Sequence, residues 1–425
     1  MEAETKTPLL TPLMRWFMLA MVLANTAAAM YPMLMAIYLY DELGASVEQV
    51  GLVFTLSSIA IMALQIFGGY ISDSIGRLQA IAIGSIGGIA GFLAVLLAPT
   101  WQWMVVALSI SQFPRALIGP SFGAFIAENS TEENRGKVYG VTDTIFQITG
   151  VFGPPLGGLL VDGYGFRSML LVSTALYSMA AGLRIWMART TRFSAEARPK
   201  SVQAMNFGTF KSNLRTMAGM VFGGGVLTWI FVTDGVRDIA FRLSGELQPL
   251  YLDQVGGISA KEIGLLGSIF SIAMMFTPIL SGRISDRKGE RVPIAGGFLL
   301  VFFAFVIFLN VNTFLGFAIT WVVFGTGVGL LSPAYQSLIS KVVPQKMLGL
   351  FNGIFYSSLG LISLPAPWIG AQLWERYSPQ FPFYITAAAA LLTIVPIWLF
   401  FKVPEKKVDD SASNPLVPAV AEPTD

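Results

Sequence analysis

The chain has 425 residues and contains neither cysteine nor histidine. The absence of cysteine excludes disulfide bonds and thiol nucleophiles, and the absence of both excludes metal sites built on Cys or His ligands. A proton relay through imidazole is excluded too, so any proton chemistry must use Asp, Glu, Tyr, Lys or Arg. No Ser, His or Cys constellation supports nucleophilic catalysis.

Charged residues are scarce. They make up 12% of the chain, about half the share of an ordinary soluble domain. Hydrophobic residues make up 54%, and the mean hydropathy is +0.66. The 43 glycines and 32 phenylalanines suit helices that pack closely in lipid. Composition and recurring apolar runs of about twenty residues predict an all-α, polytopic membrane protein rather than a soluble chain with a very large core.

The apolar runs predict twelve transmembrane helices in two bundles of six. They span residues 14–40, 48–72, 77–98, 102–127, 137–161, 167–190, 224–252, 261–284, 291–311, 315–340, 348–373 and 381–402. The bundles therefore occupy 14–190 and 224–402, joined by a polar, basic linker over 191–223. Residues 1–13 form an N-terminus without the features of a cleaved signal peptide, and 403–425 a disordered tail.

Lys and Arg are distributed unevenly between the two sides of the membrane. Most of the 27 lie on the side of the termini, the linker and every second loop, and Arg184 near the end of the sixth helix is counted there. Because basic residues collect on the cytoplasmic side, we expect both termini and the linker to be cytoplasmic. The expected location is the cytoplasmic membrane of the cell.

An internal repeat relates the two bundles. The stretch "GYISDSIG" from Gly69 recurs as "GRISDRKG" from Gly282, a shift of 213 residues, and the same shift pairs Pro154 with Pro367. It also pairs many glycines without a gap. Parallel six-helix repeats related by an axis along the membrane normal form one transporter architecture.

These paired loops resemble the signature loops of the major facilitator superfamily, between helices two and three and between helices eight and nine. The resemblance implies two pseudo-symmetric bundles around a central cavity, a rocking motion that gives alternating access, and a cytoplasmic gate. Ser74, Leu78 and Glu290 depart from the family's pattern. The gate residues implied by the resemblance are Gly69, Asp73, Gly76, Arg77, Gly282, Asp286, Gly289 and Arg291.

The stretch "PRALIGPSFG" places Arg115 within the fourth predicted helix. It resembles the family's helix-four motif, in which an arginine is followed by a glycine, here Gly119. The resemblance implies a role in proton coupling. The alternative is an arginine tied to backbone carbonyls or to a local acid.

The stretch "GPPLGG" in the fifth predicted helix resembles a motif enriched in the family's antiporters, and so favours efflux. Glycine and proline also make a helix bendable and give it a flat packing face, so simple close packing is the alternative. The motif residues are Gly153, Pro154, Gly157 and Gly158.

The seventh predicted helix carries five charged residues: Asp234, Arg237, Asp238, Arg242 and Glu246. At 100° per residue they lie on one face, with acid–base spacing of four residues on either side of Arg242. Each charge at bilayer depth costs roughly 2.5–3.5 kcal/mol, so the face must meet water or protein. The resemblance implies that it lines the cavity, and a salt-bridge ladder that only fixes helix packing is the alternative. Weaker cavity candidates are Asn25, Tyr31, Gln112, Asp143, Gln147, Tyr335, Gln336 and Tyr356.

The sequence contains no P-loop for ATP, so an ion gradient, expected to be of protons, is the energy source. We predict a secondary transporter that exports a small organic or drug-like molecule. An uptake permease for a sugar, organic anion or other metabolite is the alternative, and an intramembrane enzyme or non-transporting receptor a remote one. The expected partners are the substrate, protons and the lipid bilayer, with no catalytic residue, metal, cofactor or nucleic acid, and the resemblance implies a monomer.

Overall fold

The computed structural model describes residues 10–60, 77–132, 134–190, 219, 221, 223–345 and 348–401. Nearly all residues in these ranges are helical, and none is in a strand. Eight of the described helices are long and apolar enough to cross a membrane, which confirms an all-α, multi-pass membrane protein. The gate residues Gly69, Asp73 and Gly76, nearly all of the linker and the tail 403–425 lie outside the described residues.

The first half of the chain consists of α1 (Pro12–Met30), η1 (Pro32–Leu34), α2 (Met35–Ile37), η2 (Tyr38–Glu42), a helix over 47–60, α4 (Arg77–Leu97), α5 (Trp101–Ser111), α6 (Phe113–Glu128) and α7 (Arg135–Thr190). The last of these is two helices in series. Gly165, with φ of +81° and ψ of +165°, separates them, as predicted for the loop between 161 and 167.

The second half consists of α9 (Val226–Gly245), α10 (Gln248–Gln254), α11 (Ala260–Lys288), α12 (Arg291–Phe308), α13 (Phe314–Val342), α14 (Leu348–Ile362), α15 (Ala366–Arg376) and α16 (Phe381–Phe400). A helix overlaps each of the twelve predicted ranges. The number of spans stays a prediction, because the second, fourth and seventh ranges are not among the eight long apolar helices.

Four predicted helices are interrupted near a proline, contrary to our expectation of continuous spans. The breaks lie before Pro32, at Gln112 before Pro114, before Pro249 and at Pro365. Proline lacks an N–H and clashes with the preceding turn, which weakens a helix at that point. Other prolines, such as Pro333 in α13, stay inside a continuous helix, so the tertiary packing decides which of them breaks it.

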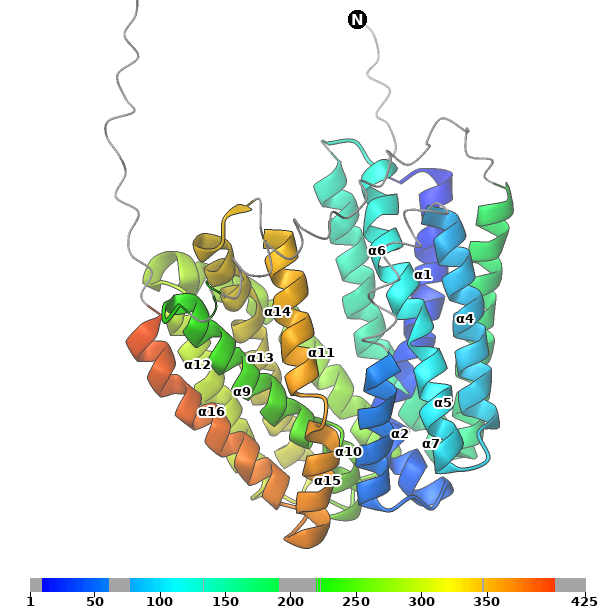
Figure 1. Cartoon of the computed structure of the whole chain (residues 1–425). Coiled ribbons are helices and arrows are strands. Elements are labelled where there is room, and N and C mark those ends of the chain that lie inside the picture. The colour runs from blue at the N-terminus through cyan, green and yellow to red at the C-terminus, as the bar shows by residue number, and fades with distance from the viewer. Residues whose placement is uncertain are drawn as a thin grey trace, which may run out of the picture.

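The helices of each half pack mainly on one another, and the two halves stand side by side (Figure 1). In the first half α7 packs on α1 and α4, and in the second α12 packs on α13 and α16. Contact between the halves comes chiefly from α7 and α11. Helix α1 begins and α16 ends at the same end of the molecule (Figure 1), which we call the terminal side; the opposite end is the far side.

The repeat found in the sequence reappears as matched contacts within each half. Helix α7 approaches α1 so closely that a Cβ on Gly157 would lie 2.0 Å from the carbonyl oxygen of Met30. In the second half a Cβ on Gly370 would lie 1.8 Å from the carbonyl oxygen of Leu243. Both residues of the second pair follow their counterparts by the same 213 positions, so the two halves share this contact as well as sequence.

The contacts between the halves obey the same symmetry. A Cβ on Gly51 would lie 2.6 Å from the carbonyl oxygen of Pro367, and one on Gly264 would lie 2.5 Å from that of Pro154. The 213-residue shift exchanges these two pairs. The first half therefore meets the second through two equivalent glycine–proline contacts, as expected for bundles related by a two-fold axis.

Hydrogen bonds close the far side between the halves. The carboxylate of Glu48 accepts bonds from Gln372 Nε2 (2.6 Å) and Trp368 Nε1 (3.3 Å), and its backbone N–H donates to Glu375 Oε1 (2.9 Å). The backbone N–H of Trp368 donates to Thr55 Oγ1 at 3.1 Å. These bonds join the helix over 47–60 to α15.

Further along α11 from its start, this helix is hydrogen-bonded to α7, and towards the terminal side the ribbons of the two halves diverge (Figure 1). Ser268 donates to the carbonyl of Val151 at 2.5 Å, and Ser271 to that of Gly150 at 3.0 Å. Towards the terminal side, glycines of α6, α7 and α14 face open space: a Cβ on Gly119, Gly136, Gly140 or Gly353 would meet nothing within 4 Å. Figure 1 shows the two halves in contact on the far side and diverging towards the terminal side, where these glycines lie exposed. We call this arrangement closed on the far side and open towards the terminal side.

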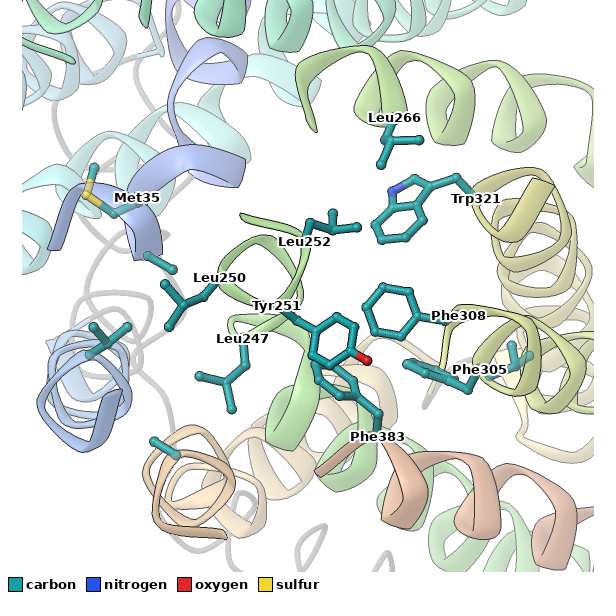
Figure 2. Close-up of a cluster of buried hydrophobic side chains, with 14 of the residues drawn as sticks. Met35, Leu247, Leu250, Tyr251, Leu252, Leu266, Phe305, Phe308, Trp321 and Phe383 are labelled. Carbon is teal, nitrogen blue, oxygen red and sulfur yellow. The ribbon is translucent and has the colours of Figure 1, made fainter. Parts of the chain in front are cut away.

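Aromatic side chains pack the second half around α10 (Figure 2). The ring of Tyr251 lies 4.7 Å from that of Phe308 and 5.0 Å from that of Phe383. A small pocket beside this cluster is lined mostly by apolar side chains, with Gln248 and Thr320 as its polar members. The charged residues of α9 are not part of its lining, so it is not the candidate site.

Candidate functional site

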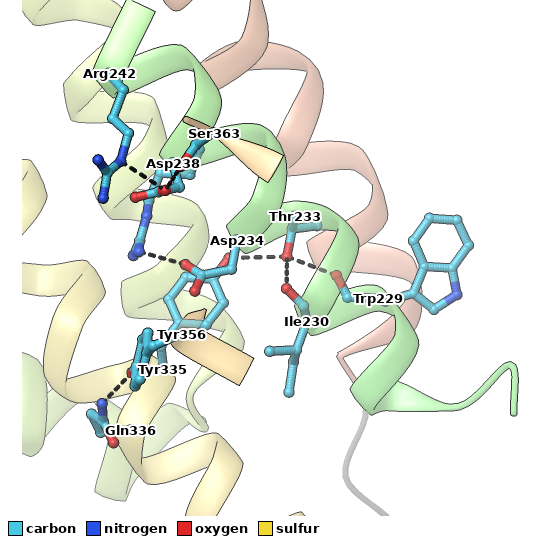
Figure 3. A network of polar contacts seen from close by, with 11 residues as sticks. Trp229, Ile230, Thr233, Asp234, Asp238, Arg242, Tyr335, Gln336, Tyr356 and Ser363 are labelled. Carbon is cyan, nitrogen blue, oxygen red and sulfur yellow. Dashed lines mark hydrogen bonds and ion pairs between the residues drawn. The ribbon is translucent and has the colours of Figure 1, made fainter. Parts of the chain in front are cut away.

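The first part of the charged stripe of α9, from Asp234 to Asp238, faces protein. Helix α9 begins after three glycines, and its N-cap Gly225 is extended; Thr228 Oγ1 donates to the carbonyl of Val221. The helix then packs against α13, α14, α15 and α16. The stripe meets α13 and α14 (Figure 3), which relieves the cost of charges that lipid would impose.

The first ion pair of the stripe is buried. Arg237 Nη2 lies 2.7 Å from Asp234 Oδ1, and the side chain of Asp234 is only 3% exposed. The guanidinium of Arg237 stacks over the ring of Tyr335 at 5.5 Å, and the Tyr335 hydroxyl donates to Thr233 Oγ1 at 3.0 Å. This pair is built into the contact between α9 and α13 and supports the structural interpretation for these two charges.

The second ion pair is more accessible. Arg242 Nε lies 3.1 Å from Asp238 Oδ2, and the two side chains are 40% and 27% exposed. Ser363 of the α14–α15 connection donates a further hydrogen bond to Asp238 Oδ2 (Figure 3). Exposure thus rises along the stripe away from the start of α9, and Asp238 is held by two partners without being sealed from water.

The predicted ion pair between Arg242 and Glu246 is not formed, because Arg242 pairs with Asp238 instead. Arg242 Nε is directed at Asp238, and Glu246, which is exposed, interacts electrostatically with both Arg242 and Arg115. Arg115 lies on α6 in the other half, is exposed, and also interacts with Tyr31. The last residue of the stripe, Glu246, is therefore near a charged residue of the first half, Arg115.

Two weaker candidates differ in their surroundings. The side-chain nitrogen of Asn25 in α1 is buried and has no hydrogen-bond partner among the described residues. Asp143 of α7 is exposed. It lies on the same helix face as Gly150 and Pro154, the residues that meet α11. Asp143 therefore lies on the inner surface of the first half, in the part that is open.

The first gate loop is described only from Arg77 onwards. Arg77 Nε lies 3.2 Å from Glu128 Oε1 at the end of α6.

The second gate loop is described in full. Asp286 is exposed, and Gly289 has a φ of +81°, a left-handed conformation that favours glycine. The guanidinium of Arg291 lies over the ring of Trp398 at 4.9 Å. A Cβ on Gly282 would meet nothing within 4 Å, so close helix packing is not its role in this state.

The helix-five motif lies in two tight contacts at once. A Cβ on Gly153 would lie 2.5 Å from Ala29 Cβ in α1, and one on Gly158 would lie 2.3 Å from the carbonyl oxygen of Ala260 in α11. The motif thus joins the first half internally and also joins it to the second half. This geometry supports the close-packing interpretation at the interface between the two halves.

Two residues had no usable signal in the sequence. Ser363 is one serine among many in the helices, and only the fold brings it to Asp238. Arg184 was counted with the basic residues of the terminal side, and the structure shows that its side chain is buried within the bundle. It is 4% exposed inside the first half, where its Nη1 donates to Ser85 Oγ at 3.3 Å. Its place near a helix end hid the burial, because long basic side chains there usually reach water.

No group of three acidic side chains in the described ranges is placed to hold a metal ion. Two helical halves related by a repeat, with charged residues where they face each other, define a secondary-transporter architecture. The chain belongs to the Major Facilitator Superfamily, whose family model matches residues 17–236 and 240–423. It is therefore a multi-pass membrane transporter and not an enzyme.

Similar proteins include drug-resistance transporters. A "Multi-drug resistance efflux pump PmrA homolog" of Lactococcus lactis is 24% identical over 357 residues, which cover 82% of this chain and 84% of that protein. "Multidrug resistance protein MdtG" of Escherichia coli is 22% identical over 358 residues, covering 82% and 83%. Among solved structures, a mutant of the nucleoside transporter NupG superposes with a TM-score of 0.76 at 14% identity, covering 92% of this chain and all of that one.

Proposed function

We propose that this transporter exports small organic, drug-like molecules in exchange for protons. The observation that carries the proposal is the graded stripe on α9. It runs from a sealed pair at Asp234 to an accessible acid, Asp238, and ends opposite Arg115 of the other half. The relatives named for multidrug resistance and efflux support the export direction.

In the proposed arrangement the protein is a monomer in the cytoplasmic membrane, with the termini and the linker 191–223 in the cytoplasm. The bundles 14–190 and 224–402 then rock about the helix-five contacts. The described state is open to the cytoplasm, and closing the terminal side would open the far side. The loops around Asp73 and Asp286 act as the cytoplasmic gate.

Within the site, Asp238 is the proposed proton carrier. Its carboxylate already pairs with Arg242 and accepts a hydrogen bond from Ser363. When Asp238 binds a proton it releases Arg242, so its carboxylate is never an unpaired charge where water is scarce. Arg242 is then free to interact with Glu246, which Arg115 also faces. This links proton binding on one half to a charge on the other, whereas Asp234, Arg237 and Tyr335 hold α9 in place.

The test uses purified protein in proteoliposomes loaded with a pH-sensitive dye, with ethidium as the transported probe. We expect a proton gradient to drive ethidium in the direction opposite to proton flow, and ethidium movement to alter the internal pH. Proton and ethidium moving in the same direction, or ethidium moving without protons, would contradict proton-coupled export.

One observation favours an organic-anion permease as the second candidate. Three arginines, Arg115, Arg237 and Arg242, lie within predicted spans, and Arg115 is exposed where the halves face each other. Guanidinium groups bind carboxylates in a two-pronged geometry. Counterflow of a small carboxylate, with ethidium inactive in parallel vesicles, would favour this candidate.

A further inference from the structure

The 213-residue shift relates two ion pairs of opposite polarity. In the first half Arg77 at the start of α4 pairs with Glu128 at the end of α6, at 3.2 Å. In the second half Glu290, which precedes α12, pairs with Lys341 at the end of α13. Position 290 corresponds to 77 and position 341 to 128, so each half has the same bridge with acid and base exchanged. An ion pair retained with its charges reversed indicates that the bridge itself, and not the sign at either place, is needed.

Glu290 is unusually well anchored for a loop residue. Its side chain is 6% exposed, and its Oε1 accepts a hydrogen bond from Ser337 Oγ at 2.9 Å besides the contact with Lys341. Burial alone would raise the pKa of Glu290. Bonds from Lys341, from the backbone and from Ser337 outweigh burial and hold this pKa below its ordinary value. The group is therefore a charged anchor at neutral pH.

The anchor reaches helix α13 beside the charged site. Ser337 directly follows Tyr335 and Gln336 along α13. The guanidinium of Arg237 stacks on the Tyr335 ring, and the Tyr335 hydroxyl donates a hydrogen bond to Thr233. Next to it, Gln336 Nε2 donates to the hydroxyl of Tyr356. Thus one turn of α13 holds the second gate loop through Glu290 and the α9 stripe through Tyr335.

We propose that Glu290 is a positioning residue that couples the second gate loop to the charged site through helix α13, with Lys341 and Ser337 as its partners. A shift of α9 against Tyr335 then moves the turn that holds the loop, and the loop responds at the terminal side. The inference rests on the proposed gate role of the loop and is independent of the coupling ion.

The test compares Glu290→Gln, Lys341→Gln and the double variant Glu290→Arg with Lys341→Glu, which copies the polarity of the first half. Hydrogen exchange in lipid nanodiscs needs no ligand. We expect each single variant to speed exchange in residues 286–292 and also in 333–342, and the double variant to restore both. A change confined to the loop, or no rescue by the double variant, would overturn the proposal.

Ethidium counterflow in proteoliposomes gives the functional readout. Turnover in the single variants should fall about tenfold, which corresponds to about 1.4 kcal/mol, with an unchanged half-saturating concentration, and the reversed pair should recover it. Weaker half-saturation with unchanged turnover would place Glu290 in the binding site instead and overturn the coupling role. If ethidium is not carried, hydrogen exchange alone decides the outcome.

Arg287→Gln is the matched control. Arg287 is an exposed residue in the same loop. Removing its charge should leave hydrogen exchange unchanged in both 286–292 and 333–342. Failure of proton-coupled export would appear in the transport by the wild type. Failure of this inference would appear in the hydrogen exchange of the variants, as a change confined to the loop or as no rescue by the double variant.

Discussion

Asp234 and Asp238 lie one helical turn apart on α9 and differ in what surrounds them. The carboxylate of Asp234 is buried against Arg237 and Tyr335, whereas that of Asp238 is 27% exposed between Arg242 and Ser363. A buried pair loses much stability when one partner is removed, because the other charge stays buried without compensation. An accessible pair can exchange its partner at lower cost.

Asp238→Asn should abolish proton-driven transport and leave substrate exchange measurable. Asparagine keeps the size and the bond from Ser363 but cannot bind or release a proton at this place. Net flux and counterflow, measured in parallel with ethidium in proteoliposomes, separate the two activities. A variant that still moves ethidium against its gradient in a pH-dependent way would rule out Asp238 as the proton carrier.

Asp234→Asn is the contrasting variant. It should lower the stability of the protein by about 3–5 kcal/mol, the usual loss when one member of a buried ion pair is removed. Thermal unfolding in detergent measures this loss, and unchanged stability would contradict the structural role.

Arg115→Lys should lose most coupled transport although the protein still inserts and folds. The charge is kept, but lysine cannot bind a carboxylate through two parallel hydrogen bonds. Arg167→Lys, at an exposed position of the first half, is the matched control and should behave as wild type. Near-normal transport by the Arg115 variant would favour an arginine whose charge alone matters.

At the scale of helices, α7 depends on close approach to α1. A Cβ on Gly157 would lie 2.0 Å from the carbonyl oxygen of Met30, and a backbone oxygen cannot move aside as a flexible side chain can. The same contact occurs at Gly370 in α15.

Gly157→Ala should therefore lower stability by about 1–3 kcal/mol, the usual range for overpacking. Gly182→Ala in the same long helical element is the control, since a Cβ there would meet nothing within 4 Å, and alanine favours helix by up to about 1 kcal/mol over glycine. Thermal unfolding in detergent compares the two variants. Equal melting temperatures would show that the helices separate more readily than their contact indicates.

For the whole molecule, the proposed exchange between two open states would depend on the hydrogen bonds that close the far side. The carboxylate of Glu48 accepts bonds from Trp368 and Gln372 in this state. Each such bond contributes about 0.5–1.5 kcal/mol, so losing both shifts the balance by roughly 1–3 kcal/mol, or about five- to 150-fold.

Glu48→Ala should increase the population that is open on the far side. The chain contains no cysteine, so pairs of spin labels can be introduced at chosen far-side positions without removing native thiols. Distances between such labels in the two halves should lengthen in the variant, and pairs on the terminal side should shorten. An unchanged distribution would show that the glycine–proline contacts alone keep the far side closed.

Several features of the fold could be predicted from the periodicity and spacing of residues in the sequence. The helical ranges, the two related halves and the clustering of the α9 charges on one face depend on the chain's own repeats, which local geometry converts into structure. The pairing of Asp238 with Arg242 followed likewise, because residues four apart on a helix are neighbours.

The sequence by itself determined that this protein crosses a membrane as two repeats of one helical pattern, because lipid accepts only helices with internally satisfied backbones in such apolar runs. Tertiary structure alone decided which prolines break a helix, that Arg184 is buried, that Ser363 reaches Asp238, and that Arg115 of one half faces Glu246 of the other. Each of these depends on residues far apart in the chain. Their contacts are set by how whole helices pack, and no local pattern records that packing.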